Sequence, residues 1–217
     1  MANQGIGSKQ YFEQYYSNRT WEAYSEIVAL IVRHSTPGPI LDLGCGTGLL
    51  VECASRWGLS CKGVDGSQDA VDIAKKRFPG LDVSHQYFEA PLPMSDGAFS
   101  SVVMNQVIEH LESSTAEMCL DEAFRVLRSG GMLLVTSPSI FNRAEAEADR
   151  THVRMYSPSS LHHLLSSRGF SEIVPIDTPL ELFGNGRLAK RMSSLVFRMT
   201  GWERLSASAS CFAFKRE

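Results

Sequence analysis

Glycines at alternate positions follow a short apolar segment, residues 40–43, and would form a loop that lacks every second side chain. The glycines are Gly44, Gly46 and Gly48. Because glycine reaches dihedral angles that are closed to other residues, such a loop lets a ligand touch the backbone. A second apolar segment ends at Asp65, about 20 residues further on, where the acid of a neighbouring strand meets the hydroxyl pair of a ribose. The combination predicts a site for a nucleoside cofactor.

The spacing of the glycines indicates which nucleoside this is. A dinucleotide fingerprint reads G-x-G-x-x-G and cradles a pyrophosphate at a helix N-terminus. Here the spacing is G-x-G-x-G, and Asp42 stands two residues before Gly44. A carboxylate there would repel a pyrophosphate, which disfavours a nicotinamide-dependent oxidoreductase, but it would suit a ligand with an ammonium group and no phosphate. S-adenosylmethionine is such a ligand, with adenosine at one end, an amino acid at the other and a sulfonium between them.

At these residues the sequence resembles the class I S-adenosylmethionine-dependent methyltransferases. Residues 41–49 resemble the first motif of that family, and Val64-Asp65 resembles its ribose-binding acid. Residues 99–111 resemble the family's motif at the fourth strand, and residues 125–131 resemble the turn before its fifth. Residues 149–161 are similar to a segment of small-molecule members such as the ubiquinone-pathway O-methyltransferases.

Two positions depart from the family pattern. Ser100 follows Phe99 where the family often has an aspartate, and Phe88-Glu89-Ala90 stands where an acid and a small residue often meet the adenine. Neither departure touches the glycine loop or Asp65. The resemblance implies an α/β fold, a Rossmann-like three-layer sandwich with a seven-stranded, mostly parallel sheet. The C-terminal strand would be antiparallel and inserted beside the sixth.

The resemblance also implies which residues form the site. Asp42 would hold the methionine end of the cofactor, Asp65 the ribose and Glu89 the adenine amino group. The expected cofactor-binding residues are Asp42, Gly44, Cys45, Gly46, Gly48, Asp65, Gly66, Ser67, Glu89, Asn105 and Tyr16. Tyr16 belongs to a group of aromatic residues near the N-terminus. An aromatic face attracts a cation such as sulfonium, although these residues could instead form the core face of a helix.

Two histidines, His110 and His152, are candidates for a general base, since histidine most often fills that role near neutral pH. The alternatives are a core histidine and a loop-anchoring histidine. Arg154 and Tyr156 would bind an acidic or hydroxylated acceptor, or form a surface cation and a packing aromatic. No metal site is expected, because Glu109-His110 lacks further ligands at fixed spacing.

The expected reaction is methyl transfer from S-adenosylmethionine to an oxygen or nitrogen of a small-molecule acceptor in biosynthetic or secondary metabolism. The alternatives are an RNA or protein methyltransferase and a non-catalytic S-adenosylmethionine-binding module. A net charge of −3 over 217 residues argues against nucleic acid, so no DNA partner is expected. Five cysteines without a C-x-x-C pair, and no signal peptide, indicate reduced thiols in a cytoplasmic protein, either monomer or homodimer.

Apolar segments alternate with helical patterns, which predicts a parallel sheet covered on both faces. The predicted strands are 40–43, 59–65, 83–88, 101–105, 132–136, 173–176 and 211–215, and the predicted helices are 8–35, 48–57, 67–77, 114–127 and 157–167. We expect one methyltransferase domain over 1–217. Its parts would be a helical lid (1–36), a core (37–178 and 206–217) and a helical insertion near the acceptor (179–205). The basic stretch 187–202 could contact a membrane, although a helix that caps the site is the favoured interpretation.

Overall fold

The computed structural model describes residues 8, 10–12, 20–176 and 206–216. A seven-stranded sheet forms its centre, with the strand order β3-β2-β1-β4-β5-β7-β6. The strands are β1 Ile40–Leu43, β2 Cys61–Asp65, β3 Val83–His85, β4 Phe99–Asn105, β5 Leu127–Thr136, β6 Ser171–Pro175 and β7 Cys211–Phe214. Strands β1 to β5 pair in parallel, and β7 runs antiparallel to both β5 and β6. The expected sheet, with an inserted antiparallel last strand, is confirmed.

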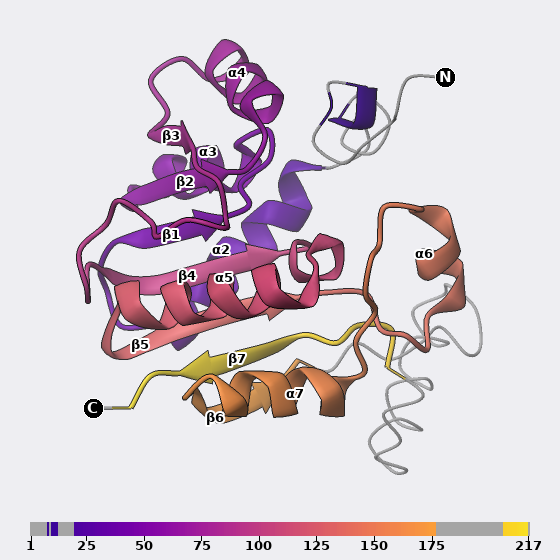
Figure 1. Cartoon of the computed structure of the whole chain (residues 1–217). Helices are drawn as coiled ribbons and strands as arrows, with labels where there is room; N and C mark the ends of the chain where they lie inside the picture. The colour runs from indigo at the N-terminus through magenta and orange to yellow at the C-terminus, as the bar shows by residue number, and fades with distance from the viewer. Residues whose placement is uncertain (1–7, 9, 13–19, 177–205, 217) are drawn as a thin grey trace, which may run out of the picture.

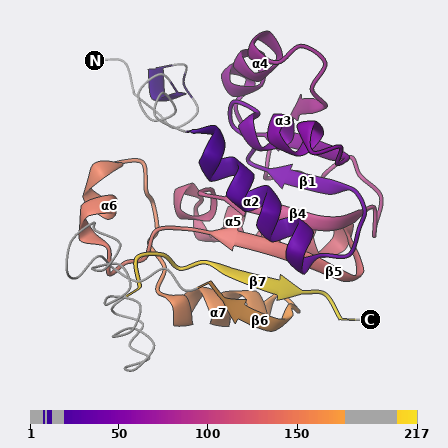
Figure 2. The same cartoon turned by 180° about the vertical axis from the view of Figure 1, so that it is seen from behind.

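Helices cover both faces of this sheet. They are α2 Trp21–His34, α3 Leu49–Arg56, α4 Gln68–Arg77, α5 Ser113–Val126, α6 Arg143–Ala148 and α7 Pro158–Ser167, with a 3₁₀ turn, η1, at Ile108–His110. In Figure 1, α5 and α7 lie in front of the sheet, and the reverse view in Figure 2 brings α2 and α3 to the front. Helix α4 packs beside α3 against β2 and β3. The three expected layers are present.

The central strands are apolar on both faces, as buried parallel strands usually are. In β4, Val102 and Met104 pack with the residues of α5 and α7, whereas Val103 packs with α2 and α3. In β5, Leu133 and Leu134 divide in the same way between the two faces. All five of these side chains are 0% exposed, so the middle of the sheet is buried on both faces.

The carboxyl ends of β1, β2 and β4 meet at one edge, because these strands are parallel. Leu43 pairs with Val64 in β2, and Asp42 pairs with Val103 in β4. Strand β1 therefore lies between β2 and β4, and the sheet order reverses there. In open α/β sheets, ligands bind in the crevice at such a reversal point.

Several expected boundaries shift by a few residues, and the predicted helix 8–35 is interrupted, since α2 begins only at Trp21 after its extended N-cap Thr20. Strand β2 begins at Cys61 rather than 59, and β3 ends at His85 rather than 88. The predicted start of the helix at residue 67 is nearly right, since Ser67 is the N-cap of α4 and its side chain accepts a hydrogen bond from the backbone N–H of Ala70. The sequence pattern gave no sign of α6.

The predicted division into lid, core and insertion stays a prediction. Within residues 1–36, α2 packs against the sheet through Tyr24, Val28 and Ile31. The insertion at 179–205 lies outside the described residues. Among the helices that the structure describes, none has the length and apolar character to cross a membrane.

Candidate functional site

A cavity of about 370 Å³ opens at the carboxyl edge of β1, β2 and β4, a volume typical of small-molecule sites. It is lined by Tyr11, Phe12, Gly44, Asp65, Gly66, Ser67, Tyr87, Phe88, Glu89, Gln106, Val107, His110, Leu111 and Thr115. Six of these residues were predicted from the sequence: Gly44, Asp65, Gly66, Ser67, Glu89 and His110. The fold thus brings the glycine loop, the strand-end acid and a candidate base into one space.

The glycine loop approaches the cavity through its backbone. Gly44, Gly46 and Gly48 all have positive φ, at 89°, 50° and 79°, a region that side chains disfavour. A Cβ placed on Gly44 would lie 2.4 Å from Cγ2 of Val107, which follows β4. Only glycine allows β1 and the turn after β4 to come this close.

Asp65 ends β2 and holds the glycine loop from the side. Its Oδ2 accepts a hydrogen bond of 2.7 Å from the N–H of Gly46, and its Oδ1 accepts one of 2.8 Å from the N–H of Ser67. Burial raises the pKa of this carboxyl overall, and the two N–H donors and the nearby His85 offset only part of the rise. The carboxylate is therefore oriented by the chain and also borders the cavity.

Asp42 lies beneath the loop rather than on the cavity wall. It is 2% exposed, and burial, together with the charge of Asp65, raises its pKa to about 8. Cys45 is also buried, and burial raises the pKa of its thiol well above the usual value. Cys45, Gly46 and Gly48 do not line the cavity, so any contact of theirs with a ligand stays a prediction.

The turn after β4 carries the opposite wall of the cavity. Gln106 lines it with a φ of 58°, which is uncommon for a residue other than glycine and is often found at functional sites. Its N–H donates to the carbonyl oxygen of Thr136 at 2.9 Å. Asn105, a predicted cofactor residue, accepts a hydrogen bond of 2.6 Å from the Thr136 hydroxyl and does not line the cavity.

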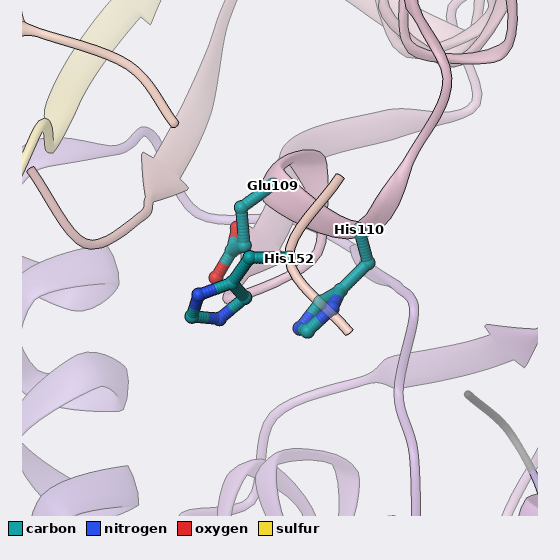
Figure 3. A group of neighbouring side chains, drawn as sticks. All are labelled: Glu109, His110 and His152. Atoms are coloured by element: carbon teal, nitrogen blue, oxygen red, sulfur yellow. The ribbon is translucent and has the colours of Figure 1, made fainter. Parts of the chain in front are cut away.

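The loop between α6 and α7 contacts this turn. The N–H groups of Val153 and Arg154 donate to the carbonyl oxygen of Glu109 at 2.8 and 3.0 Å. The two bonds bring His152 beside Glu109 and His110, as Figure 3 shows. The rings of His110 and His152 lie 4.9 Å apart between centroids. The two predicted histidines are thus neighbours, although only His110 lines the cavity.

Glu109, His110 and His152 have donor atoms that all lie within 4.8 Å of one another. The sequence offered only the adjacent pair Glu109-His110, and the fold adds His152 as a third group. An acid and two imidazoles at this spacing can share a proton or hold a divalent cation. Among the described residues this is the one such group.

The other predicted residues lie away from the cavity. Tyr156 is 1% exposed and packs in the core below α7. Arg154 is exposed; its guanidinium lies over the Tyr156 ring and donates to the Ser113 hydroxyl at 2.6 Å. This geometry lends no support to the acceptor roles predicted for the two residues. Tyr16 falls outside the described residues.

Sequence reasoning missed most of the apolar and aromatic wall. Tyr11 and Phe12 are each 6% exposed and pack on Ala70 of α4. They belong to the aromatic group near the N-terminus, from which the pattern alone could not select the members that reach the cavity. Tyr87 and Phe88 directly precede the predicted Glu89 and line the cavity with it. Nothing in their local pattern separates them from residues of an ordinary loop.

The chain is similar in sequence to several methyltransferases. A probable S-adenosylmethionine-dependent methyltransferase of Mycolicibacterium smegmatis is 29% identical over 174 residues, which are 78% of this chain and 65% of that protein. The mitochondrial ubiquinone biosynthesis O-methyltransferase of Rattus norvegicus is 32% identical over 153 residues, 61% of this chain and 44% of that enzyme. A demethylmenaquinone methyltransferase of Tropheryma whipplei is 28% identical, over 78% of this chain and 70% of that protein. The chain thus spans less than two thirds of the first two proteins.

Solved structures agree on the fold. A crystal structure of a SAM-dependent methyltransferase from Archaeoglobus fulgidus superposes with a TM-score of 0.73 at 16% identity, covering 96% of this chain and 100% of that one. A possible histamine N-methyltransferase from Thermotoga maritima gives 0.64 at 23% identity, covering 90% of this chain and 89% of that one.

A family model described as a methyltransferase domain matches residues 14–174. This range, more than half of the chain, contains β1, β2 and β4 and all the cavity residues except Tyr11 and Phe12. The class of protein that the glycine spacing and Asp65 indicated is confirmed. The chain belongs to the methyltransferase-domain family.

Proposed function

We propose that the protein transfers a methyl group from S-adenosylmethionine to a hydroxyl group of a small aromatic molecule. The observation that carries the proposal is that Gly44, Asp65 and His110 line the same cavity. A side-chain-free backbone, a carboxylate and an imidazole are the groups that a sulfonium nucleoside and a hydroxyl acceptor require.

The residues present fit S-adenosylmethionine. Each oxygen of Asp65 accepts one backbone hydrogen bond and keeps acceptor capacity for the hydroxyls of a ribose. Tyr87 and Phe88 offer aromatic surface to a nucleobase, with Glu89 beside them. Tyr11 and Phe12 offer aromatic faces to a cation. No phosphate-binding cation lines the cavity among the described residues, which suits an uncharged adenosine.

The chain contributes alignment and a base to the reaction. When bound, S-adenosylmethionine supplies a methyl group activated by a positively charged sulfur, which leaves as a neutral thioether. Holding two reactants in attack geometry is worth about 7–11 kcal/mol. His110 lines the cavity and accepts the proton of the acceptor hydroxyl, a contribution of about 10²–10⁴-fold for a well-placed base. His152 does not line the cavity, so His110 is the base that we propose.

The acceptor hydroxyl is proposed to be phenolic. A phenol has a pKa of about 10, and an imidazole of about 6.5 can take its proton much more readily than that of an aliphatic alcohol. The apolar wall of Val107 and Leu111 suits an aromatic ring. The names of two relatives, a ubiquinone biosynthesis O-methyltransferase and a demethylmenaquinone methyltransferase, favour quinone-like acceptors.

Two measurements test the proposal. Calorimetry with S-adenosylmethionine, S-adenosylhomocysteine and NAD should show binding of the first two and none of NAD. A methyl-transfer screen over catechols, hydroquinones, amines, sugars and short RNAs should show turnover of a phenolic compound. Binding of NAD, without binding of the other two ligands, would overturn the assignment of the cofactor. Turnover of RNA alone, or tight cofactor binding without any turnover, would overturn the acceptor class in favour of an RNA enzyme or a non-catalytic module.

A pair of histidine variants separates the base from the fold. His110→Ala should lower turnover by about 10²-fold or more and leave the affinity for S-adenosylhomocysteine nearly unchanged. His163→Ala, which alters an exposed histidine on α7, is the matched control and should change neither quantity. Equal turnover in the two variants would remove His110 from the proposal.

A further inference from the structure

A chain of polar contacts leads from the N-terminal segment to His110. The Tyr11 hydroxyl donates to Oδ2 of Asp149 at 3.3 Å. Oδ1 of Asp149 accepts from the hydroxyl and from the backbone N–H of Thr151, at 2.6 and 2.9 Å. The same Thr151 hydroxyl oxygen lies 3.1 Å from Nδ1 of His110. Asp149 and Thr151 belong to the loop after α6, whereas His110 ends η1, so the contacts join two segments far apart in the sequence.

These contacts decide which nitrogen of His110 carries the proton. A threonine hydroxyl has one proton, and Thr151 gives it to the Asp149 carboxylate, which can only accept. Toward His110 the Thr151 hydroxyl is therefore an acceptor. The Thr151 carbonyl oxygen, 3.3 Å from the same Nδ1, is an acceptor as well. Two acceptors facing Nδ1 require it to be the protonated nitrogen.

We infer that Asp149 and Thr151 are positioning residues, which hold neutral His110 with its proton on Nδ1 and so keep the lone pair of Nε2 for the acceptor hydroxyl. The catalytic meaning of this inference rests on the proposed function, whereas the tautomer itself does not. A carboxylate that fixes the tautomer of a catalytic histidine serves the same purpose in hydrolytic triads. Here the threonine hydroxyl stands between the two groups.

The proton balance of the step is simple. The acceptor O–H bond breaks as its oxygen attacks the methyl carbon that is transferred. The proton passes to Nε2, which gives an imidazolium. Asp149 stays ionised and is the nearby negative charge that stabilises this cation. Burial raises the pKa of Asp149, but the hydrogen bonds from the Thr151 hydroxyl and N–H, together with the charges that His110 and His152 carry when protonated, lower the pKa overall. After the product leaves, the imidazolium returns its proton to solvent.

The N-terminal segment takes part in the same arrangement. Tyr11 lines the cavity, its ring meets the His110 ring edge-on at 6.2 Å between centroids, and its hydroxyl holds the second oxygen of Asp149. Tyr11, which lines the cavity, thus hydrogen-bonds one oxygen of Asp149, and Thr151, which contacts His110, hydrogen-bonds the other. A change in the segment around Tyr11 would therefore reach the base through Asp149.

Two substitutions of Thr151 test the inference. Thr151→Val keeps the shape and removes the hydroxyl, whereas Thr151→Ser keeps the hydroxyl. Two-bond ¹H–¹⁵N correlation spectra of the ¹⁵N-histidine-labelled protein report the tautomer, with the His110 signals assigned by their loss in His110→Gln. We expect an Nδ1–H tautomer in the parent and in Thr151→Ser, and a mixture with Nε2–H in Thr151→Val.

The same variants should differ in turnover. Thr151→Val should lower kcat about 10–100-fold, the range known for loss of a group that orients a metal-ligating histidine, with KM and S-adenosylhomocysteine affinity changed less than about twofold. Thr151→Ser should restore most of kcat. An Nε2–H tautomer in the parent, or a Thr151→Val protein with unchanged tautomer and kcat, would overturn the inference. A tautomer shift in Thr151→Val without turnover of any acceptor would support the positioning role and overturn the proposed function instead.

Discussion

Asp65 accepts a hydrogen bond of 2.7 Å from the backbone N–H of Gly46, so the acid that ends β2 is tied to the glycine loop that follows β1. Its other oxygen takes the N–H of Ser67 at 2.8 Å. The carboxylate is thereby oriented by the chain itself, and the side chain that holds the loop also lines the cavity.

Asp65→Asn should weaken cofactor binding strongly. The amide keeps the size of the carboxylate but loses its charge and turns an NH₂ group toward one of the two N–H donors. Loss of a hydrogen bond to a charged acceptor costs about 1.5–3 kcal/mol, so we expect the Kd for S-adenosylhomocysteine to rise about 10–100-fold in calorimetry.

Asp82→Asn is the matched control for this substitution. Asp82 precedes β3 and forms a 2.9 Å ion pair with Lys62 of β2, while its side chain remains 63% exposed. It does not line the cavity, so the control should leave the Kd within about twofold. Equal affinities in Asp65→Asn and the parent would show that the ligand does not use this carboxylate.

Gly44→Ala should destabilise the protein for two separable reasons. The new Cβ would lie 2.4 Å from Cγ2 of Val107, and the backbone would be held at a φ of 89°. Steric overlap and backbone strain each cost about 1–3 kcal/mol, so we expect the free energy of unfolding to fall by about 2–6 kcal/mol in urea denaturation.

Gly58→Ala isolates the backbone part of this cost. Gly58 has a φ of 74°, and a Cβ placed on it would meet nothing within 4 Å. Its substitution should cost no more than about 1–3 kcal/mol. Adding Val107→Ala to Gly44→Ala should recover part of the stability that Gly44→Ala loses beyond Gly58→Ala. If Gly44→Ala and Gly58→Ala cost the same, the close approach of β1 and the turn after β4 is not what requires the glycine.

The parts of the site that the sequence predicted are those that depend on local backbone geometry. The glycine loop and Asp65 stand at strand ends, and parallel pairing of β1 with β2 is enough to bring them together. Ser67 caps α4 by a contact within three residues. Signals of this kind are carried by spacing along the chain, which a sequence displays directly.

The parts that could not be predicted depend on contacts between distant segments. Tyr11 forms a hydrogen bond with Asp149, which lies 138 positions away in the sequence, and His110 forms one with Thr151, 41 positions away. Tyr156 was expected either at the acceptor or as a packing aromatic; its side chain is buried in the core, and an isolated bridge pairs its backbone with Ser139. Which aromatic faces a cavity and which fills a core is decided by such packing.

The buried carboxyl of Asp42 should make the stability of the unliganded protein depend on pH. Burial and the charge of Asp65 raise its pKa from 3.8 to about 8. The folded state therefore binds this proton more tightly than the unfolded chain. Stability that is present below about pH 4 is lost as the pH rises toward 8.

Asp42→Asn removes that titration without changing the size of the side chain. At pH 8.5 the variant should be more stable than the parent by at least about 1 kcal/mol, or roughly 2–4 °C in melting temperature. At pH 4 the two should be similar. Parallel melting curves at every pH would show that Asp42 has an ordinary pKa in the folded protein.

Removal of divalent cations tests what the cluster of Glu109, His110 and His152 does. A sulfonium donor leaves as a neutral thioether, and His110 can take the acceptor proton, so the proposed transfer needs no Lewis acid. We expect dialysis against EDTA to leave kcat within about twofold of the untreated value, and added Mg²⁺ or Mn²⁺ to have as little effect. Loss of activity on chelation, with recovery on adding a cation, would assign the cluster to metal binding. It would then be the metal, rather than His110, that makes the hydroxyl acidic.

His152→Ala distinguishes the two cases further. It should leave the activity nearly intact if His110 acts alone, and it should abolish the recovery by cations if the three residues bind one together.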